Sequence, residues 1–176
     1  MGLLVNKSIK DSVLGSHPVS SRLISIRLRA TPFNITVIQA YAPTTDYDDE
    51  QVEEFYTQLQ NIIDQVDKKD ILIIQGDWNA KVGTDSIKDW RNYCGPSCNE
   101  STNERGLRLL EFASYNNMVL ANTLGDQKAS RRWTFHAPNG IPHQIDYIMV
   151  QNRFRSGICR ARTRTFPGAD VGNDHD

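Results

Sequence analysis

The segment from residue 48 to residue 75 constrains the fold most, because a helix pattern leads directly into a short apolar strand. Between Val52 and Val66 apolar residues recur at helical spacing, acidic residues crowd the first turns, and two lysines follow the end. Residues 71–75 (ILIIQ) are almost entirely apolar, which is typical of a strand in the interior of a sheet. The acidic run therefore has a structural explanation, and we assign it no catalytic role.

The other predicted elements are mostly strands. Residues 22–30 alternate polar and apolar side chains, and residues 34–43 have the pattern of their antiparallel partner. A second helix is predicted over residues 101–117, with Ser101 and Glu104 as a capping box. Further short strands are expected at 118–121, 132–136, 144–150 and 159–166. Strands dominate by number and helices can cover them, which indicates a layered α/β sandwich.

Length and composition favour one globular domain. A chain of 176 residues can bury a sizeable core but is too short for two domains, and 39% hydrophobic residues suits a folded protein. No apolar run is long enough for a membrane span or a signal peptide, so we expect an intracellular protein, nuclear or cytoplasmic. Because the net charge is only −1, any binding to nucleic acid must use local patches.

Three cysteines raise the question of a metal site or a disulfide. Cys94 and Cys98 lie in the sequence CGPSC, and Cys159 is far away in the chain. A structural zinc site usually needs four ligands, and no second pair follows at a suitable spacing. Ordinary reduced thiols are therefore the favoured interpretation.

Polar or ionisable side chains stand at the ends of several apolar strands. They are Tyr41, Asp77, Asn79, Asp146, Asp174 and His175. Singly, each has a structural explanation as a turn residue, an edge-strand residue or a solvated residue near the terminus. Moreover, a loop of about 25 residues follows the apolar strand, and such length in a compact domain is usually functional.

Together these residues provide what hydrolysis of a phosphodiester requires. Carboxylates hold a divalent cation such as Mg²⁺, and a carboxylate or imidazole orients or deprotonates the attacking water. Amide or imidazolium donors meet the negative charge of the transition state. A carboxylate behind a histidine fixes its tautomer.

The order and wording of the motifs identify a family resemblance. The motifs are IQAYAP, GDWNA, NERG, WTFH…HQIDYIMV and NDHD. In this order they resemble the exonuclease–endonuclease–phosphatase superfamily, and most closely the RTE/BovB-type endonucleases of LINE retrotransposons. The resemblance extends over essentially the whole chain, from residue 1 to residue 176, as one partial domain.

The resemblance implies a DNase I-like, four-layered α/β/β/α sandwich that lacks the first strands and the last strand. By the same resemblance, Asp77 handles the attacking water, Asn79 contacts the phosphate and Tyr41 lies near the scissile group. Asp146 pairs with the catalytic histidine, His175. The resemblance further implies Asp174 as a metal ligand, Asn103 as a substrate contact, and Mg²⁺ as the cofactor, with Mn²⁺ as a substitute.

The chain also departs from the family pattern. It shows neither the N-terminal strand with an asparagine nor the next strand with a metal-binding glutamate, and MGLLVNKS resembles the strand that normally follows that glutamate. It also stops directly after NDHD. We therefore expect a fragment that keeps the outline of the fold but has little or no nuclease activity. Gln144 stands where some relatives have arginine.

DNA is the expected partner, and no protein partner can be inferred. Alternation would place Arg160, Arg162 and Arg164 on one strand face, where they could contact phosphates, and Trp133 could stack on a base. A solvated strand face beside a buried tryptophan is the structural alternative. Three functions stay open: a metal-dependent DNA endonuclease, a phosphatase of the same superfamily, and a catalytically defective remnant that binds nucleic acid.

Overall fold

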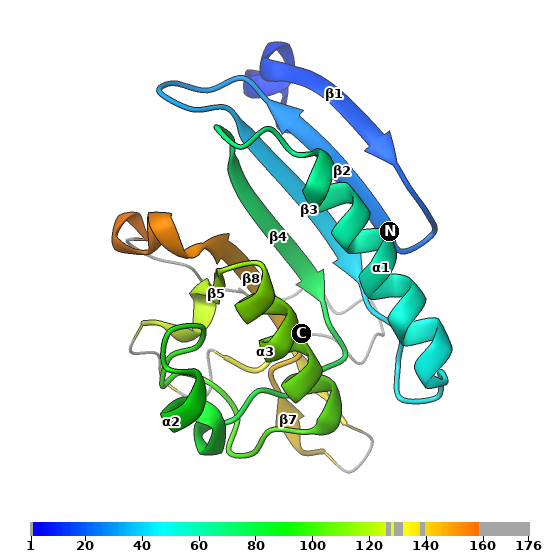
Figure 1. The fold of residues 1–176 in the computed structure, drawn as a ribbon, viewed down its shortest axis with the longest axis vertical. Coiled ribbons are helices and arrows are strands. Elements are labelled where there is room, and N and C mark those ends of the chain that lie inside the picture. Colours follow the sequence, from blue (N-terminus) through cyan, green and yellow to red (C-terminus); the bar gives the residue numbers. More distant parts are fainter. Residues whose placement is uncertain (1, 126–127, 129–131, 138–139, 159–176) are drawn as a thin grey trace. The chain divides into compact units, whose positions relative to one another are not determined.

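The computed structural model describes residues 2–125, 128, 132–137 and 140–158. The chain forms two compact units, residues 1–78 and residues 79–176, and each is described by itself. Mixed strands and helices occur throughout, as the α/β prediction requires (Figure 1). Within the described residues, no helix is both long enough and apolar enough to cross a membrane.

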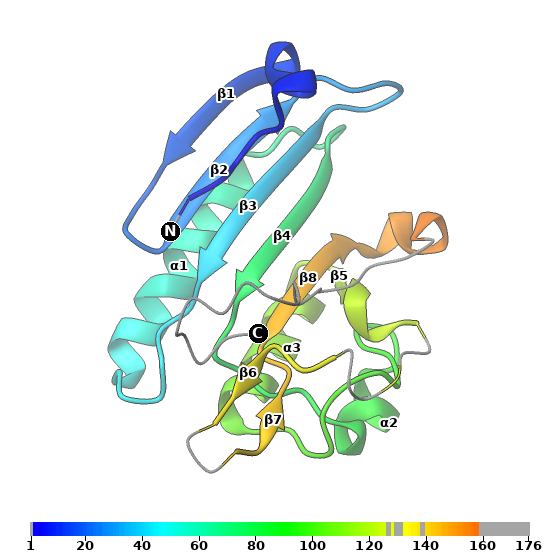
Figure 2. The same ribbon diagram turned by 180° about the vertical axis from the view of Figure 1, so that it is seen from behind.

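The first unit is a four-stranded sheet with one long helix. The strands lie in the order β1 (Val13–Pro18), β2 (Leu23–Leu28), β3 (Ile35–Tyr41) and β4 (Ile71–Asp77). β1, β2 and β3 pair antiparallel, whereas β4 runs parallel to β3. Helix α1 (Asp49–Gln65) connects the two parallel strands and lies on one face of the sheet, as Figures 1 and 2 show from opposite sides.

The sequence pattern explains this packing. α1 buries one apolar face, and β3 and β4 alternate between buried and partly exposed positions. The buried residues of α1 are Val52, Phe55, Tyr56, Leu59 and Ile62. The Asp48 side chain begins the helix by accepting a hydrogen bond from the Gln51 N–H at 2.9 Å. The strands predicted at 22–30, 34–43 and 71–75 and the predicted first helix are therefore confirmed.

The strand expected at MGLLVNKS is not found, and that prediction is wrong. Lys7–Ser12 form a 3-10 helix, and the strand begins only at Val13. The Asn6 side chain accepts a hydrogen bond from the Ser8 N–H at 3.0 Å, which starts the helical turn instead of a strand. The apolar side chains before it find no buried position, and Leu4 is fully exposed.

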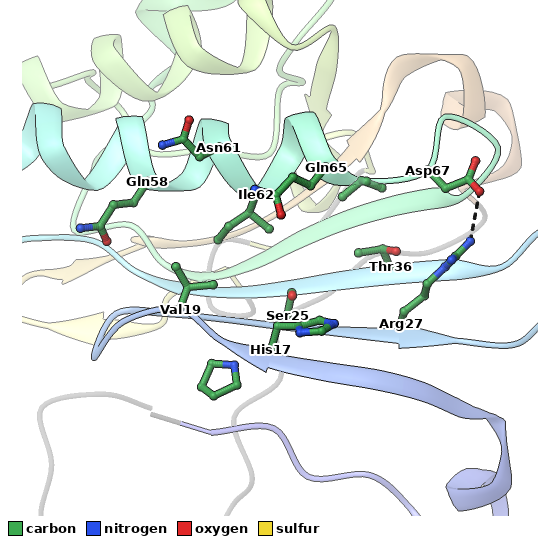
Figure 3. A pocket seen from close by; sticks show the side chains of 12 residues that line it. His17, Val19, Ser25, Arg27, Thr36, Gln58, Asn61, Ile62, Gln65 and Asp67 are labelled. Atoms are coloured by element: carbon green, nitrogen blue, oxygen red, sulfur yellow. Dashed lines mark hydrogen bonds and ion pairs between the residues drawn. The ribbon is translucent and has the colours of Figure 1, made fainter.

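A groove of about 850 Å³ runs between α1 and the sheet of this unit (Figure 3). Its lining mixes polar side chains, among them His17, Ser25, Thr36, Gln58, Asn61 and Gln65, with apolar ones such as Val19 and Ile62. Arg27 and Asp67 stand at one end, where they form an ion pair at 3.3 Å. The Arg27 guanidinium also makes two hydrogen bonds, of 2.7 and 2.8 Å, to the buried Asp70 carboxylate, which holds the pKa of that carboxyl below its usual range.

The described part of the second unit combines two α-helices with short strands. Its described elements are 3-10 helix η2 (Thr84–Ser86), α2 (Ile87–Trp90), α3 (Glu104–Tyr115), β5 (Met118–Leu120), 3-10 helix η3 (Ala121–Thr123), β6 (Phe135–His136), β7 (Pro142–His143), β8 (Asp146–Gln151) and 3-10 helix η5 (Asn152–Gly157). β5 pairs antiparallel with β8, and β6 with β7. The long loop after β4 is thus interrupted by η2 and α2.

Three elements of this unit start later than the sequence predicts. The second helix starts at Glu104 instead of residue 101, and its N-cap is Asn103, so the capping box at Ser101 is wrong. Asn103 is the stronger cap because its side-chain oxygen accepts the Gly106 N–H at 2.8 Å. The strand expected at 132–136 is shortened to β6, and the one expected at 144–150 begins at Asp146. The strand expected at 159–166 lies outside the described residues.

Candidate functional site

The first part of the candidate site lies at the carboxyl ends of the parallel strands β3 and β4. Tyr41 is the last residue of β3, Asp77 is the last residue of β4, and the two are register partners. The Ala42 N–H donates to the Asp77 carbonyl at 2.9 Å, so the pairing continues to the tip. Tyr41 is 40% exposed and Asp77 is half-buried, which leaves both accessible from solvent. The structure therefore brings together two of the residues that the motifs singled out.

Gly76 sets the spacing of the two strands just before this pair. It has φ = +146°, and a Cβ atom on it would lie 1.8 Å from the Ala40 carbonyl oxygen. Only glycine tolerates both the backbone conformation and so close an approach. The glycine of the GDWNA motif thus positions Asp77 beside Tyr41.

Trp78 fixes the chain between the two polar residues of the same motif. Its side chain is only 1% exposed, and its ring packs edge-on against Phe55 of α1 with centroids 6.3 Å apart. Asn79 follows in a left-handed conformation, with φ = +46°. The buried side chain of Trp78 therefore fixes the backbone between Asp77 and Asn79.

A cation that the sequence analysis missed lies beside Tyr41. The Arg22 guanidinium stands 5.3 Å from the Tyr41 ring centroid and 4.6 Å from that of Tyr47, and it donates to the Tyr41 carbonyl at 3.3 Å. Stacking between two aromatic rings is a stable position for an arginine. No short motif includes Arg22, because the contact depends on the antiparallel pairing of β2 with β3.

Asp146 belongs to the second unit, where buried side chains hold its backbone. The Asp146 N–H donates to the Thr134 hydroxyl at 3.3 Å, and the Asp146 carbonyl accepts from the Asn122 amide at 3.0 Å. Thr134 and Asn122 are both buried. These two hydrogen bonds fix the backbone of Asp146 at the start of β8, and its catalytic role stays a prediction.

The neighbouring Gln144 is part of the core. It is only 1% exposed, and its backbone is bonded in both directions to the Asn99 side chain, at 2.9 Å each. The Tyr147 hydroxyl donates to the Gln144 carbonyl at 3.0 Å and accepts the Val82 N–H at 3.0 Å. Burial raises the pKa of Tyr147. This network ties the start of β8 to the segment after Asn79.

Asn103 already uses its side-chain oxygen within the protein. The oxygen accepts from the Gly106 N–H at 2.8 Å and from the Lys81 N–H at 3.0 Å. The Asn103 N–H in turn donates to the Lys81 carbonyl at 3.0 Å. The contacts observed for Asn103 are structural, and its role toward a substrate stays a prediction.

Lys81 and His143 form a pair that the sequence analysis did not single out. The Lys81 Nζ lies 3.2 Å from the His143 Nε2, and both residues are half-buried. Burial and, to a smaller degree, the lysine charge lower the pKa of His143, so the ring is neutral near pH 7 and its Nε2 can accept a hydrogen bond from the lysine ammonium. Lys81 directly follows the GDWNA motif and His143 is the first residue of HQIDYIMV, and this position was the signal that could have drawn attention to them.

The remaining predicted substrate contacts are only partly described. Trp133 is half-buried and lies 5.5 Å from the Arg132 guanidinium, which also donates to the Cys98 carbonyl at 2.6 Å. A base-stacking role for Trp133 stays a prediction. Several other candidates lie outside the described residues, namely Arg160, Arg162, Arg164, Asp174 and His175.

The cysteines of CGPSC are free and buried. Burial raises the pKa of Cys94 to about 11 and that of Cys98 to about 12.

We expect the Cys94 and Cys98 thiols to resist alkylation by iodoacetamide at pH 8 in the folded chain and to react in guanidinium. Peptide mass spectrometry measures the alkylation. Because unfolded thiols ionise near pH 9.0 and these do not, the stability they contribute is complete below pH 9.0 and declines as the pH rises toward 11–12. Rapid labelling of the native chain at pH 8 would contradict this expectation.

The described residues do not make up a metal site on their own. Within residues 2–125, 128, 132–137 and 140–158, no group of three or more His, Cys, Asp or Glu side chains could hold a metal ion. Asp77 and Asp146 have the hard oxygen atoms that Mg²⁺ prefers, but they belong to different units. The predicted metal ligand, Asp174, lies outside the described part.

Known proteins are similar to this chain over nearly its whole length. Craniofacial development protein 2 from Bos taurus is 42% identical over 99% of this chain, and the protein of the same name from Tragulus javanicus is also 42% identical. The chain spans only 29% and 30% of these relatives. A family model described as "Endonuclease-reverse transcriptase" matches residues 35–176.

Solved structures share the fold at low sequence identity. The AP endonuclease LMAP from Leishmania major superposes with a TM-score of 0.57 at 16% identity, over 88% of this chain and 52% of that one. The endonuclease domain of TRAS1, a telomere-specific non-LTR retrotransposon, gives a TM-score of 0.52 at 14% identity, over 77% of this chain and 52% of that one. These neighbours confirm the prediction of a mixed α/β, DNase I-like fold. The chain belongs to the endonuclease-reverse transcriptase family of the endonuclease/exonuclease/phosphatase superfamily.

Proposed function

We propose that this chain carries the site of a metal-dependent endonuclease that hydrolyses phosphodiester bonds in DNA. The observation that carries the proposal is the side-by-side placement of Tyr41 and Asp77 at the ends of β3 and β4, in a chain of this family. A hydroxyl and a carboxylate at adjacent strand ends are well placed to act on one phosphate group.

Each side chain has a proposed task. The Asp77 carboxylate orients the attacking water and accepts its proton, while the Tyr41 hydroxyl and the Asn79 amide donate hydrogen bonds to phosphoryl oxygens. Asp146 holds the tautomer of His175, which lies outside the described residues. The requirement for Mg²⁺, or Mn²⁺ in its place, belongs to the proposal and is supported by the family resemblance.

Nicking of supercoiled plasmid tests this function. We expect nicking in Mg²⁺ or Mn²⁺, none in EDTA, and a loss of about 100-fold or more in Asp77→Asn and Asp146→Asn, because each substitution removes a group that handles a proton or positions one. Asp89→Asn is the matched control, since Asp89 is an exposed carboxylate in α2 of the second unit. It should nick at the rate of the unaltered chain.

Three results would contradict the proposal. Nicking that persists in EDTA would exclude the metal requirement, and equal nicking by Asp77→Asn would exclude the assigned site. Hydrolysis of p-nitrophenyl phosphate without plasmid nicking would indicate a phosphatase instead.

A further inference from the structure

Lys81, which contacts His143, carries a half-buried positive charge. Among the described residues this charge has no acidic partner. Lys81 forms its observed side-chain contact with His143, and the ion pairs among the described residues do not include it. A neutral imidazole accepts one hydrogen bond but does not balance the charge. Partial burial of a lysine charge is costly without an anion, so the arrangement favours an anionic ligand.

The lysine is held rigidly by the start of α3. Two hydrogen bonds of 3.0 Å join its backbone to Asn103, the N-cap of that helix. A Cβ atom on Gly106 would lie only 1.9 Å from the Lys81 carbonyl oxygen, which shows how tightly the helix packs against this segment. The positive end of the α3 dipole adds to the lysine charge.

The histidine is held by the same residue that holds Asp146. The Thr134 N–H donates to the His143 carbonyl at 2.9 Å, while the Thr134 hydroxyl accepts the Asp146 N–H at 3.3 Å. His143 is also the register partner of Phe135 in the β6–β7 pair. Lys81, two residues after Asn79, is therefore coupled through His143 to the strand that presents Asp146.

We propose that Lys81 and His143 bind a backbone phosphate of the DNA substrate, with Lys81 as the charge and His143 as its positioning residue. This inference rests on the proposed function for the identity of the ligand. Lysine suits such a contact because its ammonium group has three donors, and one of them is engaged by the histidine. The pair would also explain Asn103, whose role is then to place Lys81 instead of touching the substrate.

Binding without hydrolysis tests the proposal. The affinity of the full chain for a fluorescein-labelled DNA duplex is measured by anisotropy in EDTA at several salt concentrations. We expect Lys81→Gln to weaken binding about 5- to 10-fold and to lower the salt slope by about one, as for the loss of one phosphate contact. His143→Ala should weaken binding about 3-fold, because the lysine loses its support.

Matched variants separate a contact from a general effect of charge or folding. Lys88→Gln removes the same charge from an exposed position in α2 and should bind like the unaltered chain. Lys81→Arg retains the cation and should recover most of the affinity. The proposal is overturned if Lys81→Gln and Lys88→Gln have the same affinity and the same salt slope.

The two proposals can fail independently. Metal-dependent nicking by the chain, together with equal duplex affinity of Lys81→Gln and Lys88→Gln, would reject the phosphate contact and leave the proposed function intact. If Lys81→Gln weakens duplex binding and Lys88→Gln does not, in a chain that never nicks plasmid, the phosphate contact is supported and the proposed activity is rejected. A shift of the His143 ring resonances with inorganic phosphate, without any duplex binding, would overturn the assignment to DNA.

Discussion

Gly76→Ala is expected to lower the free energy of unfolding by about 4 kcal/mol, because it combines overpacking with a strained backbone. The new Cβ atom would lie 1.8 Å from the Ala40 carbonyl oxygen, and φ of +146° is unfavourable for any residue with a Cβ. The obstacle is backbone within the β3–β4 pair, so it cannot move aside without breaking the pairing. Urea unfolding followed by tryptophan fluorescence measures the change.

Two other glycines separate the causes of this effect. Gly140 has φ = +77° but open space around it, so Gly140→Ala should cost about 1 kcal/mol from backbone strain alone. Gly157 has open space and no unusual φ, and Gly157→Ala should change stability by less than about 0.5 kcal/mol. If Gly76→Ala lowered the free energy of unfolding no more than Gly140→Ala, the close approach of β3 and β4 at Gly76 would be contradicted. At a temperature where it stays folded, Gly76→Ala should also nick plasmid more slowly, because Tyr41 and Asp77 separate.

The sequence predicted the first unit well because its elements have clear periodicity. The alternation in residues 22–30 and 34–43 and the helical spacing from Val52 to Val66 each depend on a buried face, which local composition reveals. The end of β4 was also predictable, since an apolar strand followed by Gly76 and Asp77 places a polar residue at its tip. The start of the chain was not readable in this way, because Asn6 directs a helical turn where apolar residues suggested a strand.

The second unit was harder to predict because long-range contacts decide its structure. Asn103 begins α3 partly because its side chain also receives the Lys81 N–H, a contact across more than 20 residues. β6 is short because Thr134 is used to hold the backbone of residues 143–146. The pairs Arg22–Tyr41 and Lys81–His143 likewise depend on tertiary contacts, and motif order alone could not identify them.

Trp78→Ala is expected to lower the free energy of unfolding by about 4 kcal/mol, which is typical of truncating a large buried aromatic residue. Trp78 is 1% exposed and makes an edge-on contact with Phe55 of α1, so its removal leaves a cavity beneath the end of β4. Trp78→Phe should cost only about 1–2 kcal/mol, since a ring still fills most of the space.

The consequence for function follows from the position of Trp78 in the chain. Because it lies between Asp77 and Asn79, Trp78→Ala releases both residues, and plasmid nicking should fall about 100-fold even where circular dichroism shows a folded chain. Trp90→Ala, at a half-buried position in α2, is the control and should leave nicking unchanged. Full nicking by folded Trp78→Ala would mean that the anchor stabilises the fold but does not position the site.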